Sequence, residues 1–200
     1  MAGRPRLFDD DAAVGAAMNL FWRKGYASTT PQELASACNM AKGSLYNAFK
    51  SKANLFMLAL DSYNARKIAA LTAALEARAP APECLLAAAC SLAGLGEHTD
   101  GCFATNSAIE LAGVDSEMAE VPRRLFRQIE QAFAECIRRG QRSGDIAEEH
   151  DPARSAAVLL AAVIGVSVLA RSGRDPRPLA GLLADAVNAL THPRRPLTDG

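Results

Sequence analysis

The sequence predicts an all-α fold of about nine helices. Ala and Leu are the most frequent of the 200 residues and only 6% are aromatic, a composition that favours helices over sheets. Apolar residues recur at helical spacing along most of the chain, and Gly, Pro and capping residues separate one periodic stretch from the next. Because 50% of the residues are hydrophobic, the chain can bury a sizeable core.

The first helix is expected over residues 10–24. Asp residues at positions 9–11 provide an N-cap and a favourable charge at its start, and a glycine directly after it ends it. A second, short helix follows Thr30, which can serve as its N-cap. Pro31 then takes the first helical position and Glu33 completes a capping box.

A tight turn connects this short helix to a third one, over about residues 42–49. Asn39 suits the turn because Asn tolerates a left-handed backbone. Leu45 and Phe49 lie four residues apart and are expected to be buried. The outer face then consists of Lys42, Ser44, Asn47 and part of Tyr46. A helix with one apolar face and an opposite polar, cationic face can contact base edges and phosphates, so the pair of short helices predicts a helix-turn-helix that enters the DNA major groove.

Six further helices are expected after residue 51. Ser51 can cap a long helix over about residues 52–78, which Ala79–Pro82 ends. The apolar residues assigned to its inner faces are Leu55, Phe56, Leu58, Ala59, Tyr63, Ile68, Ala69 and Leu71. The later helices are expected over about residues 83–95, 103–112, 117–141, 152–171 and 176–190. The chain therefore divides into a three-helix N-terminal domain, residues 1–51, and a helical C-terminal domain, residues 52–200.

The charge distribution separates the two ends of the chain. The formal net charge is zero, which excludes a chain that is polybasic throughout. Residues 1–67 hold nine Lys and Arg against five Asp and Glu, whereas residues 68–200 hold thirteen against seventeen. A basic N-terminal part on an acidic body indicates a local phosphate contact, although chance gives such an asymmetry about as readily.

Neither a membrane span nor a metal site or other cofactor is expected. The first residues lack the apolar segment of a secretory signal, which predicts a cytoplasmic protein. Five Cys without a CxxC pair or a His–Cys cluster indicate reduced thiols. The apolar run over residues 155–170 is short for a membrane span and is bracketed by Arg154 and Arg171. We interpret it as a helix buried between protein surfaces, with an ordinary core helix as the alternative.

The first three predicted helices together resemble the N-terminal DNA-binding segment of TetR-family transcriptional regulators. The likeness rests on the stretch FWRKGYASTTPQELASACNMAKGSLYNAFKSKANL, in which an aromatic-x-x-x-Gly-Tyr end of the first helix precedes a Thr-capped helix and the Lys-Gly-Ser-Leu-Tyr run. The number and length of the later helices agree with the family as well. Two positions depart from it: Ala41 stands where the family often carries a capping Ser, and Asn39 replaces a common Gly. Because a lost capping oxygen costs about 1 kcal/mol, the third helix is expected to depend more on tertiary packing.

The resemblance implies a homodimer with one helix-turn-helix DNA-binding domain per subunit. The C-terminal domain would be a ligand-binding and dimerisation domain that pairs through the helices over about residues 152–171 and 176–190. A small-molecule effector would release the dimer from double-stranded operator DNA. Carried onto this sequence, the resemblance implies phosphate contacts by Thr30, Lys42, Tyr46 and Lys52. It implies base contacts by Ser44 and Asn47, with Gly43 allowing the backbone to approach closely. Arg4 and Arg6 would reach into the groove or along the DNA backbone. A merely solvated Lys52 and a buried Tyr46 are the alternatives.

The segment that starts Gly101-Cys102-Phe103 and ends at Asn106 resembles a TetR subgroup that includes regulators responding to electrophiles and to acrylate-like acids. In the electrophile responders, a Cys at this place is the sensing residue. Backbone N–H groups at a helix N-terminus lower the pKa of a thiol, so Cys102 is the candidate reactive thiol, with His98 near enough in sequence to assist. A small buried side chain is the alternative.

The effector pocket is expected among the helices of residues 52–171. The candidate lining residues are Met57, Tyr63, Cys102, Phe103, Asn106, Phe126, Ile129, Phe133 and Val163. Aromatic residues at helical spacing are equally typical of plain core. The mainly apolar lining favours a modest-sized, apolar or weakly polar effector.

The sequence therefore favours a ligand-responsive, DNA-binding transcriptional repressor. A thiol-based electrophile or redox sensor acting through Cys102 is an alternative within that class, and a helical interaction protein without DNA binding is an alternative outside it. An enzyme is not expected, because the scattered histidines form no recognisable nucleophile–base pair and the sequence has no Gly-rich phosphate loop.

Overall fold

The all-α prediction is confirmed by a computed structural model that describes residues 10–95, 100–113 and 116–192. Within those ranges all regular secondary structure is helical. The helices are α1 (Asp10–Lys24), α2 (Pro31–Ala37), α3 (Lys42–Phe49), α4 (Lys52–Leu75), α5 (Ala81–Ala93), α6 (Phe103–Leu111), α7 (Ser116–Ser143), α8 (Pro152–Arg171) and α9 (Pro176–Asn188).

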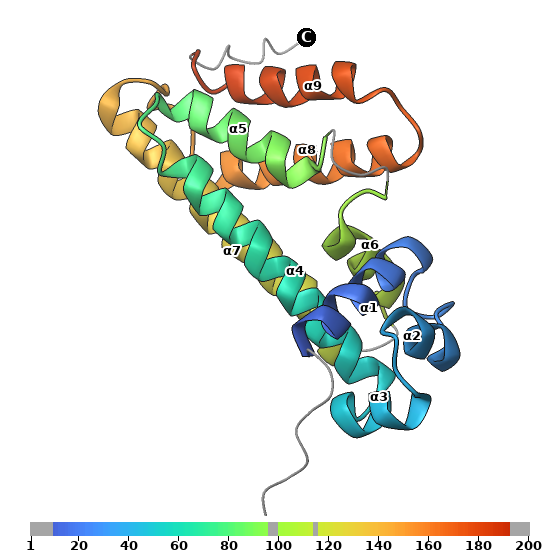
Figure 1. The fold of residues 1–200 in the computed structure, drawn as a ribbon. Helices are drawn as coiled ribbons and strands as arrows, with labels where there is room; N and C mark the ends of the chain where they lie inside the picture. The colour runs from blue at the N-terminus through green and yellow to red at the C-terminus, as the bar shows by residue number, and fades with distance from the viewer. Residues whose placement is uncertain (1–9, 96–99, 114–115, 193–200) are drawn as a thin grey trace, which may run out of the picture.

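The helices form an elongated molecule with the three short N-terminal helices at one end (Figure 1). The long helices α4 and α7 lie side by side along its length. At the other end, α5, α8 and α9 pack on one another, and α6 lies between this body and α1. The α3 helix and the α9 helix therefore stand at opposite ends of the molecule.

Local signals in the sequence fix the short helices. The side chain of Thr30 accepts a hydrogen bond from the backbone N–H of Glu33 at 3.3 Å, and the Glu33 carboxylate accepts one from the backbone N–H of Thr30 at 2.9 Å, which completes the expected capping box. Asn39 adopts a φ of 51° in the turn between α2 and α3, as its tolerance of the left-handed region predicts. The N-cap residue of α3, Ala41, makes no side-chain capping bond.

Two assignments within α4 are wrong. Leu58 is 41% exposed and Ala69 is exposed, although both were assigned to the inner faces. The reason is that an alanine-rich helix of 24 residues has no sharply polar side, so apolar spacing alone does not locate its buried face. The start of α5 also differs from the expected one at about residue 83. The helix begins at Ala81, so Pro82 lies in its first turn and not in the loop before it. A first-turn residue needs no intrahelical N–H bond.

The division into domains at residue 51 stays a prediction. The α4 helix contacts α1 and α3 as well as α5 and α7, so it runs from the N-terminal helices into the body. Any movement within the body that shifts α4 is therefore felt by the N-terminal helices.

Candidate nucleic-acid interface and the contacts behind it

The α3 helix lies at one tip of the molecule (Figure 1), and its polar side chains are exposed there. Leu45 and Phe49 are 1% and 5% exposed and anchor the helix to the other N-terminal helices. On the opposite side Lys42, Gly43, Ser44 and Asn47 are exposed, and Tyr46 is half-buried. The five positions expected to face DNA on this helix are thus brought together on one accessible surface, and their contacts to DNA stay predictions.

The hydroxyl of Thr30 belongs to the cap of α2. It donates to the Glu33 carboxylate at 2.8 Å while accepting the Glu33 N–H. The same carboxylate pairs with the Lys24 side chain. Hydrogen bonds from Lys24 first, and from Thr30 next, lower the pKa of Glu33 to about 2. The phosphate contact of Thr30 stays a prediction, and any such contact starts from a hydroxyl already held in place.

The Lys52 side chain lies against the turn between α1 and α2. Its ammonium group is 4.5 Å from the centroid of the Tyr26 ring and donates to the backbone carbonyl of Ala27 at 3.4 Å. Partial burial lowers the pKa of Lys52, and the nearby Glu110 carboxylate opposes that shift. The Lys52 side chain therefore contacts Tyr26 and Ala27 instead of being merely solvated. Its phosphate contact stays a prediction. Arg4 and Arg6 lie outside the described residues.

A cluster of aromatic rings joins the N-terminal helices to the body. Neighbouring ring centroids within it lie 4.9 to 6.2 Å apart, a spacing at which such pairs attract beyond their buried area. Its members are Phe21, Trp22, Tyr26, Phe56, Tyr63 and Phe103. The indole N–H of Trp22 also donates to the backbone carbonyl of Gly101 at 3.1 Å. The start of α6 is therefore bonded directly to α1.

One residue that sequence reasoning missed lies at the other end of α6. The Glu110 carboxylate accepts hydrogen bonds from the backbone N–H groups of Tyr26 and Ala27, at 2.8 and 2.7 Å. These residues are separated from Glu110 by more than 80 positions, so no local pattern could have indicated the contact. Carboxylate acceptors make bonds about twice as strong as neutral ones, which makes Glu110 a firm link between body and N-terminal helices.

Cys102 is the N-cap residue of α6 and is half-buried. Its sulfur accepts a hydrogen bond from the Tyr63 hydroxyl at 3.4 Å, and burial raises the pKa of Tyr63, so Tyr63 keeps its proton for that bond. Burial likewise raises the pKa of the Cys38, Cys90 and Cys136 thiols. The expected reactivity of Cys102 stays a prediction, and His98 lies outside the described residues.

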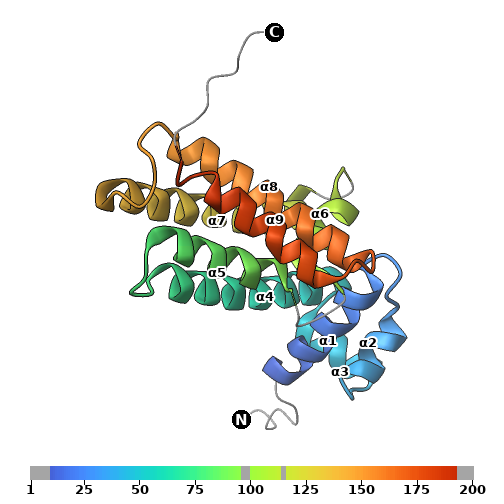
Figure 2. The ribbon, with the colours of Figure 1, turned by 90° about the horizontal axis from the view of Figure 1, so that it is seen from above.

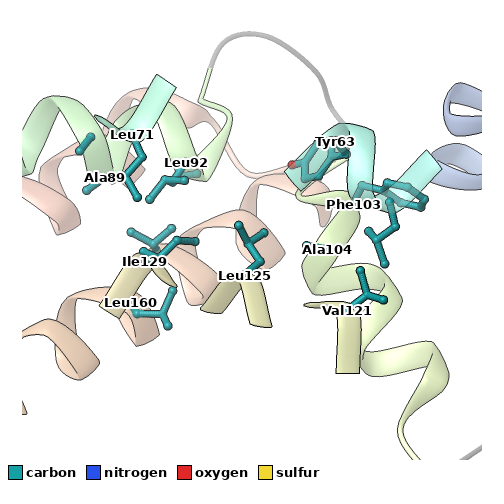
Figure 3. Close-up of a cluster of buried hydrophobic side chains, with 14 of the residues drawn as sticks. Tyr63, Leu71, Ala89, Leu92, Phe103, Ala104, Val121, Leu125, Ile129 and Leu160 are labelled. Carbon is teal, nitrogen blue, oxygen red and sulfur yellow. The ribbon is translucent and has the colours of Figure 1, made fainter. Parts of the chain in front are cut away.

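Seven of the nine candidate effector residues fall into two groups. Tyr63, Cys102 and Phe103 meet beside α1, where the Tyr63 and Phe103 ring centroids are 5.7 Å apart in an edge-to-face arrangement, and Figure 3 shows the two side chains next to each other. Other members lie on α7 and α8, where Ile129, Phe133 and Val163 are at most 4% exposed and Phe126 is half-buried. Met57 on α4 is half-buried as well. As effector contacts, all of these stay predictions.

A surface groove of about 360 Å³ lies between α1, α6 and the end of α8. Phe103 and Asn106 line it, and so do Trp22, Glu110 and Arg171. Asn106 also donates from its side chain to the backbone carbonyl of Asp100 at 3.0 Å. The groove thus borders the α6 contacts to α1 and includes two of the candidate effector residues.

A second residue without a sequence signal is Asn64 on α4. It is 8% exposed and donates weakly to the Val121 carbonyl at 3.5 Å, and its side-chain oxygen has no hydrogen-bond partner among the described residues. A buried acceptor without a donor costs about 1–3 kcal/mol. The Asn64 side-chain oxygen is therefore a buried acceptor whose cost the packing around it must offset.

An apolar stripe lies open along the outer sides of α8 and α9, which run alongside each other (Figure 2). Of the five exposed large hydrophobic side chains in the described residues, Val158, Val168 and Leu182 belong to these two helices. Exposed Ala and Gly residues fill the spaces between them, including Ala161, Gly165 and Gly181. By length and composition α8 could also cross a membrane, with 39% of its apolar window buried.

Comparisons with known proteins find related matches in both the N-terminal and the C-terminal part of the chain. Residues 14–58 match the family model for bacterial regulatory proteins of the tetR family, and residues 83–185 match the model for the tetracyclin repressor-like C-terminal domain. The HTH-type transcriptional repressor ComR of Escherichia coli (strain K12) is 31% identical over 175 residues, which cover 86% of this chain and 83% of ComR.

Two further relatives cover still more of the chain. The HTH-type transcriptional repressor BdcR of Escherichia coli (strain K12) is 26% identical over 191 residues, covering 94% of this chain and 92% of BdcR. A solved structure of a cysteine mutant of the TetR family regulator CifR, complexed with a 26bp double-strand operator DNA, matches with a TM-score of 0.82 at 27% identity. That match covers 94% of this chain and 100% of the CifR chain.

Proposed function

The chain belongs to the TetR family of bacterial regulatory proteins, and we propose that it is a transcriptional repressor that binds operator DNA as a homodimer and leaves it when a small-molecule effector binds. Its curated relatives ComR and BdcR are transcriptional repressors, not enzymes. DNA-binding regulators of the TetR family are in general soluble cytoplasmic proteins, and we place this chain in the cytoplasm.

The observation that carries the proposal is the open face of α3. Side chains of the types that bond phosphates and base edges, Lys42, Ser44 and Asn47, stand there together while two apolar residues hold the helix from behind. Asn can pair with the two hydrogen-bonding groups of adenine in the major groove. The relative CifR has been solved on its operator DNA, which supports operator binding by this chain.

The apolar stripe on α8 and α9 supports a homodimer paired through these two helices. Small residues such as Gly165 and Ala161 allow two helices to approach closely, and a second copy would cover Val158 and Leu182. Four helices packed in this way form a bundle with one shared core. We read the membrane-like length and hydropathy of α8 as a consequence of this two-sided burial.

Binding of short duplexes from the DNA beside the gene tests the proposal. Fluorescence anisotropy should find one duplex with an inverted repeat that binds two chains, with an affinity that falls steeply as salt rises. If every duplex binds no more tightly than a shuffled sequence, the proposal is wrong.

A substitution on the stripe tests the dimer separately. Gly165 is exposed, and a Cβ at this position meets no atom within 4 Å, so Gly165→Glu should leave the subunit folded while its buried charge separates the pair. We expect sedimentation to show a monomer and operator affinity to drop at least about ten-fold. The control Ala73→Glu adds the same charge to an exposed position of α4 and should stay dimeric.

A thiol sensor acting through Cys102 is the second candidate. The observation that favours it is the position of the sulfur, which accepts a hydrogen bond from the Tyr63 hydroxyl at the start of α6. This end of α6 is next to the Trp22–Gly101 bond, and the other end holds the turn after α1 through Glu110. With N-ethylmaleimide, the Cys102 S–H adds across the C=C bond: an S–C bond forms and the thiol proton ends on the adjacent carbon.

Mass spectrometry of the modified protein tests this candidate. Cys102 should be labelled before Cys38, Cys90 and Cys136, whose raised thiol pKa values keep them protonated. Labelling should release the operator duplex from the wild-type protein and not from Cys102→Ser. Release that persists in Cys102→Ser excludes this residue as the sensor.

A further inference from the structure

We propose that Glu110 is a positioning residue that holds the helix-turn-helix in its DNA-binding orientation on the body. The inference rests on the proposed function, because it concerns how the operator-binding surface is held. Glu110 belongs to α6, which packs on α4 and α7 of the body. Its carboxylate instead reaches the turn between α1 and α2.

The carboxylate holds this turn by both of its oxygens. Oε2 accepts the N–H of Tyr26 at 2.8 Å and Oε1 accepts the N–H of Ala27 at 2.7 Å. Two bonds from consecutive amides to one planar group fix the direction of the backbone as well as its distance from α6. One bond alone would fix the position of a single amide and not the direction of the backbone.

The backbone at the end of α1 is shaped for this approach. Gly25 adopts a φ of 85°, and a Cβ there would lie 3.0 Å from Oε2 and 3.2 Å from Oε1 of Glu110. A side chain at position 25 is therefore both strained in its backbone and pressed against the carboxylate. Glycine at this position serves the contact with Glu110 as well as the end of the helix.

The turn passes the constraint on to α2 and α3. The Thr29 hydroxyl donates to the Gly25 carbonyl at 2.6 Å and its N–H donates to the Tyr26 carbonyl at 3.3 Å. Thr30, the next residue, caps α2, which packs on α3. Because two half-sites on DNA have a fixed spacing, a small rotation of α3 relative to the body weakens binding by the dimer.

Substitutions that remove the charge separate this role from simple electrostatics. Glu110→Gln keeps the shape of the side chain but turns an N–H donor toward one of the two amides, and Glu110→Ala removes both acceptors. If Glu110 were only a negative charge near DNA, both changes would strengthen operator binding by reducing repulsion of the phosphates. A positioning role predicts the opposite: at least about ten-fold weaker binding in Glu110→Ala and a smaller loss in Glu110→Gln.

Two further measurements distinguish positioning from loss of a DNA contact. The dependence of affinity on salt should keep its wild-type slope, because no phosphate contact is removed. Hydrogen exchange of the Tyr26 and Ala27 amides should become faster in both variants. The control Glu120→Gln removes the same charge from an exposed residue of α7. It should change neither the salt dependence of affinity nor the exchange of the Tyr26 and Ala27 amides.

Operator affinities of both Glu110 variants within two-fold of the wild type, or unchanged exchange at Tyr26 and Ala27, would overturn the inference. If the alanine variant does not fold, the same two measurements on the glutamine variant decide the question. A wild-type protein that binds no operator contradicts the proposed function, whereas amide exchange still reports on the contact itself.

Discussion

The helices α3 and α6 are alike in length and in how they begin, yet they are used in different ways. Both start at a residue, Ala41 or Cys102, whose side chain makes no capping hydrogen bond. Two of the eight residues of α3 are buried, against five of the nine in α6. The difference teaches that α3 is held from one side so that the other is free for a partner, whereas more than half of the residues of α6 are buried in the protein. Damage to α6 should therefore reduce stability, and damage to the outer face of α3 should reduce binding.

The largest expected effect is on α6. Phe103 is 1% exposed and its ring contacts three other aromatic rings, so Phe103→Ala should lower the free energy of unfolding by about 3–5 kcal/mol. Urea unfolding followed by circular dichroism measures this change. The control Ile109→Ala on the same helix alters a side chain that is 67% exposed and should shift stability by less than about 0.5 kcal/mol. Equal effects of the two changes would remove the distinction.

The next effect is on the outer face of α3. The double substitution of Lys42→Ala and Asn47→Ala should weaken operator binding about 100-fold and leave the melting temperature unchanged, because both side chains are exposed. Removing Lys42 alone should also reduce the salt slope by about 1.8, because a dimer loses one phosphate contact in each subunit and each contact contributes about 0.9. Arg138→Ala on α7 removes the same charge from an exposed position and serves as the control. Wild-type affinity in the double variant would show that α3 is not the DNA-reading surface.

A smaller effect is expected at the start of α3. Ala41→Ser supplies the missing capping oxygen and should stabilise the protein by about 1 kcal/mol, measured as a higher urea midpoint at an unchanged slope. Ala37→Ser, at the last residue of α2, adds the same hydroxyl where no free N–H group needs it. If both substitutions act alike, capping is not what α3 lacks.

The smallest effect concerns the capped helix α2. The folded-state pKa of Glu33 is lowered from 4.5 to about 2, so its contribution to stability is fully present above pH 4.5 and is lost as the pH falls through about 2. The melting temperature of the wild type should therefore approach that of Glu33→Gln between these two pH values. Curves that stay parallel over this range would show that the carboxylate adds nothing.

The same comparison shows how far the sequence could be read. The function of α3 depends on caps, a turn and a four-residue spacing, all of which lie within 23 consecutive residues, about 30–52, so local rules predict it. The role of α6 depends on Trp22 meeting Gly101 and Glu110 meeting Tyr26, at separations of 79 and 84 residues. No local pattern carries such information. The effector residues are hard to predict for another reason: aromatic side chains at helical spacing look the same whether they line a pocket or fill a core.

The open stripe on α8 and α9 has a genetic consequence. A copy that carries the α3 substitutions still presents Val158, Val168 and Leu182, so it pairs with normal copies as readily as they pair with one another. Each such mixed dimer has a single functional helix-turn-helix and contacts only one half of the inverted repeat. In a strain that carries both alleles, the defective one should therefore be dominant, and a modest excess of it should switch on the regulated genes.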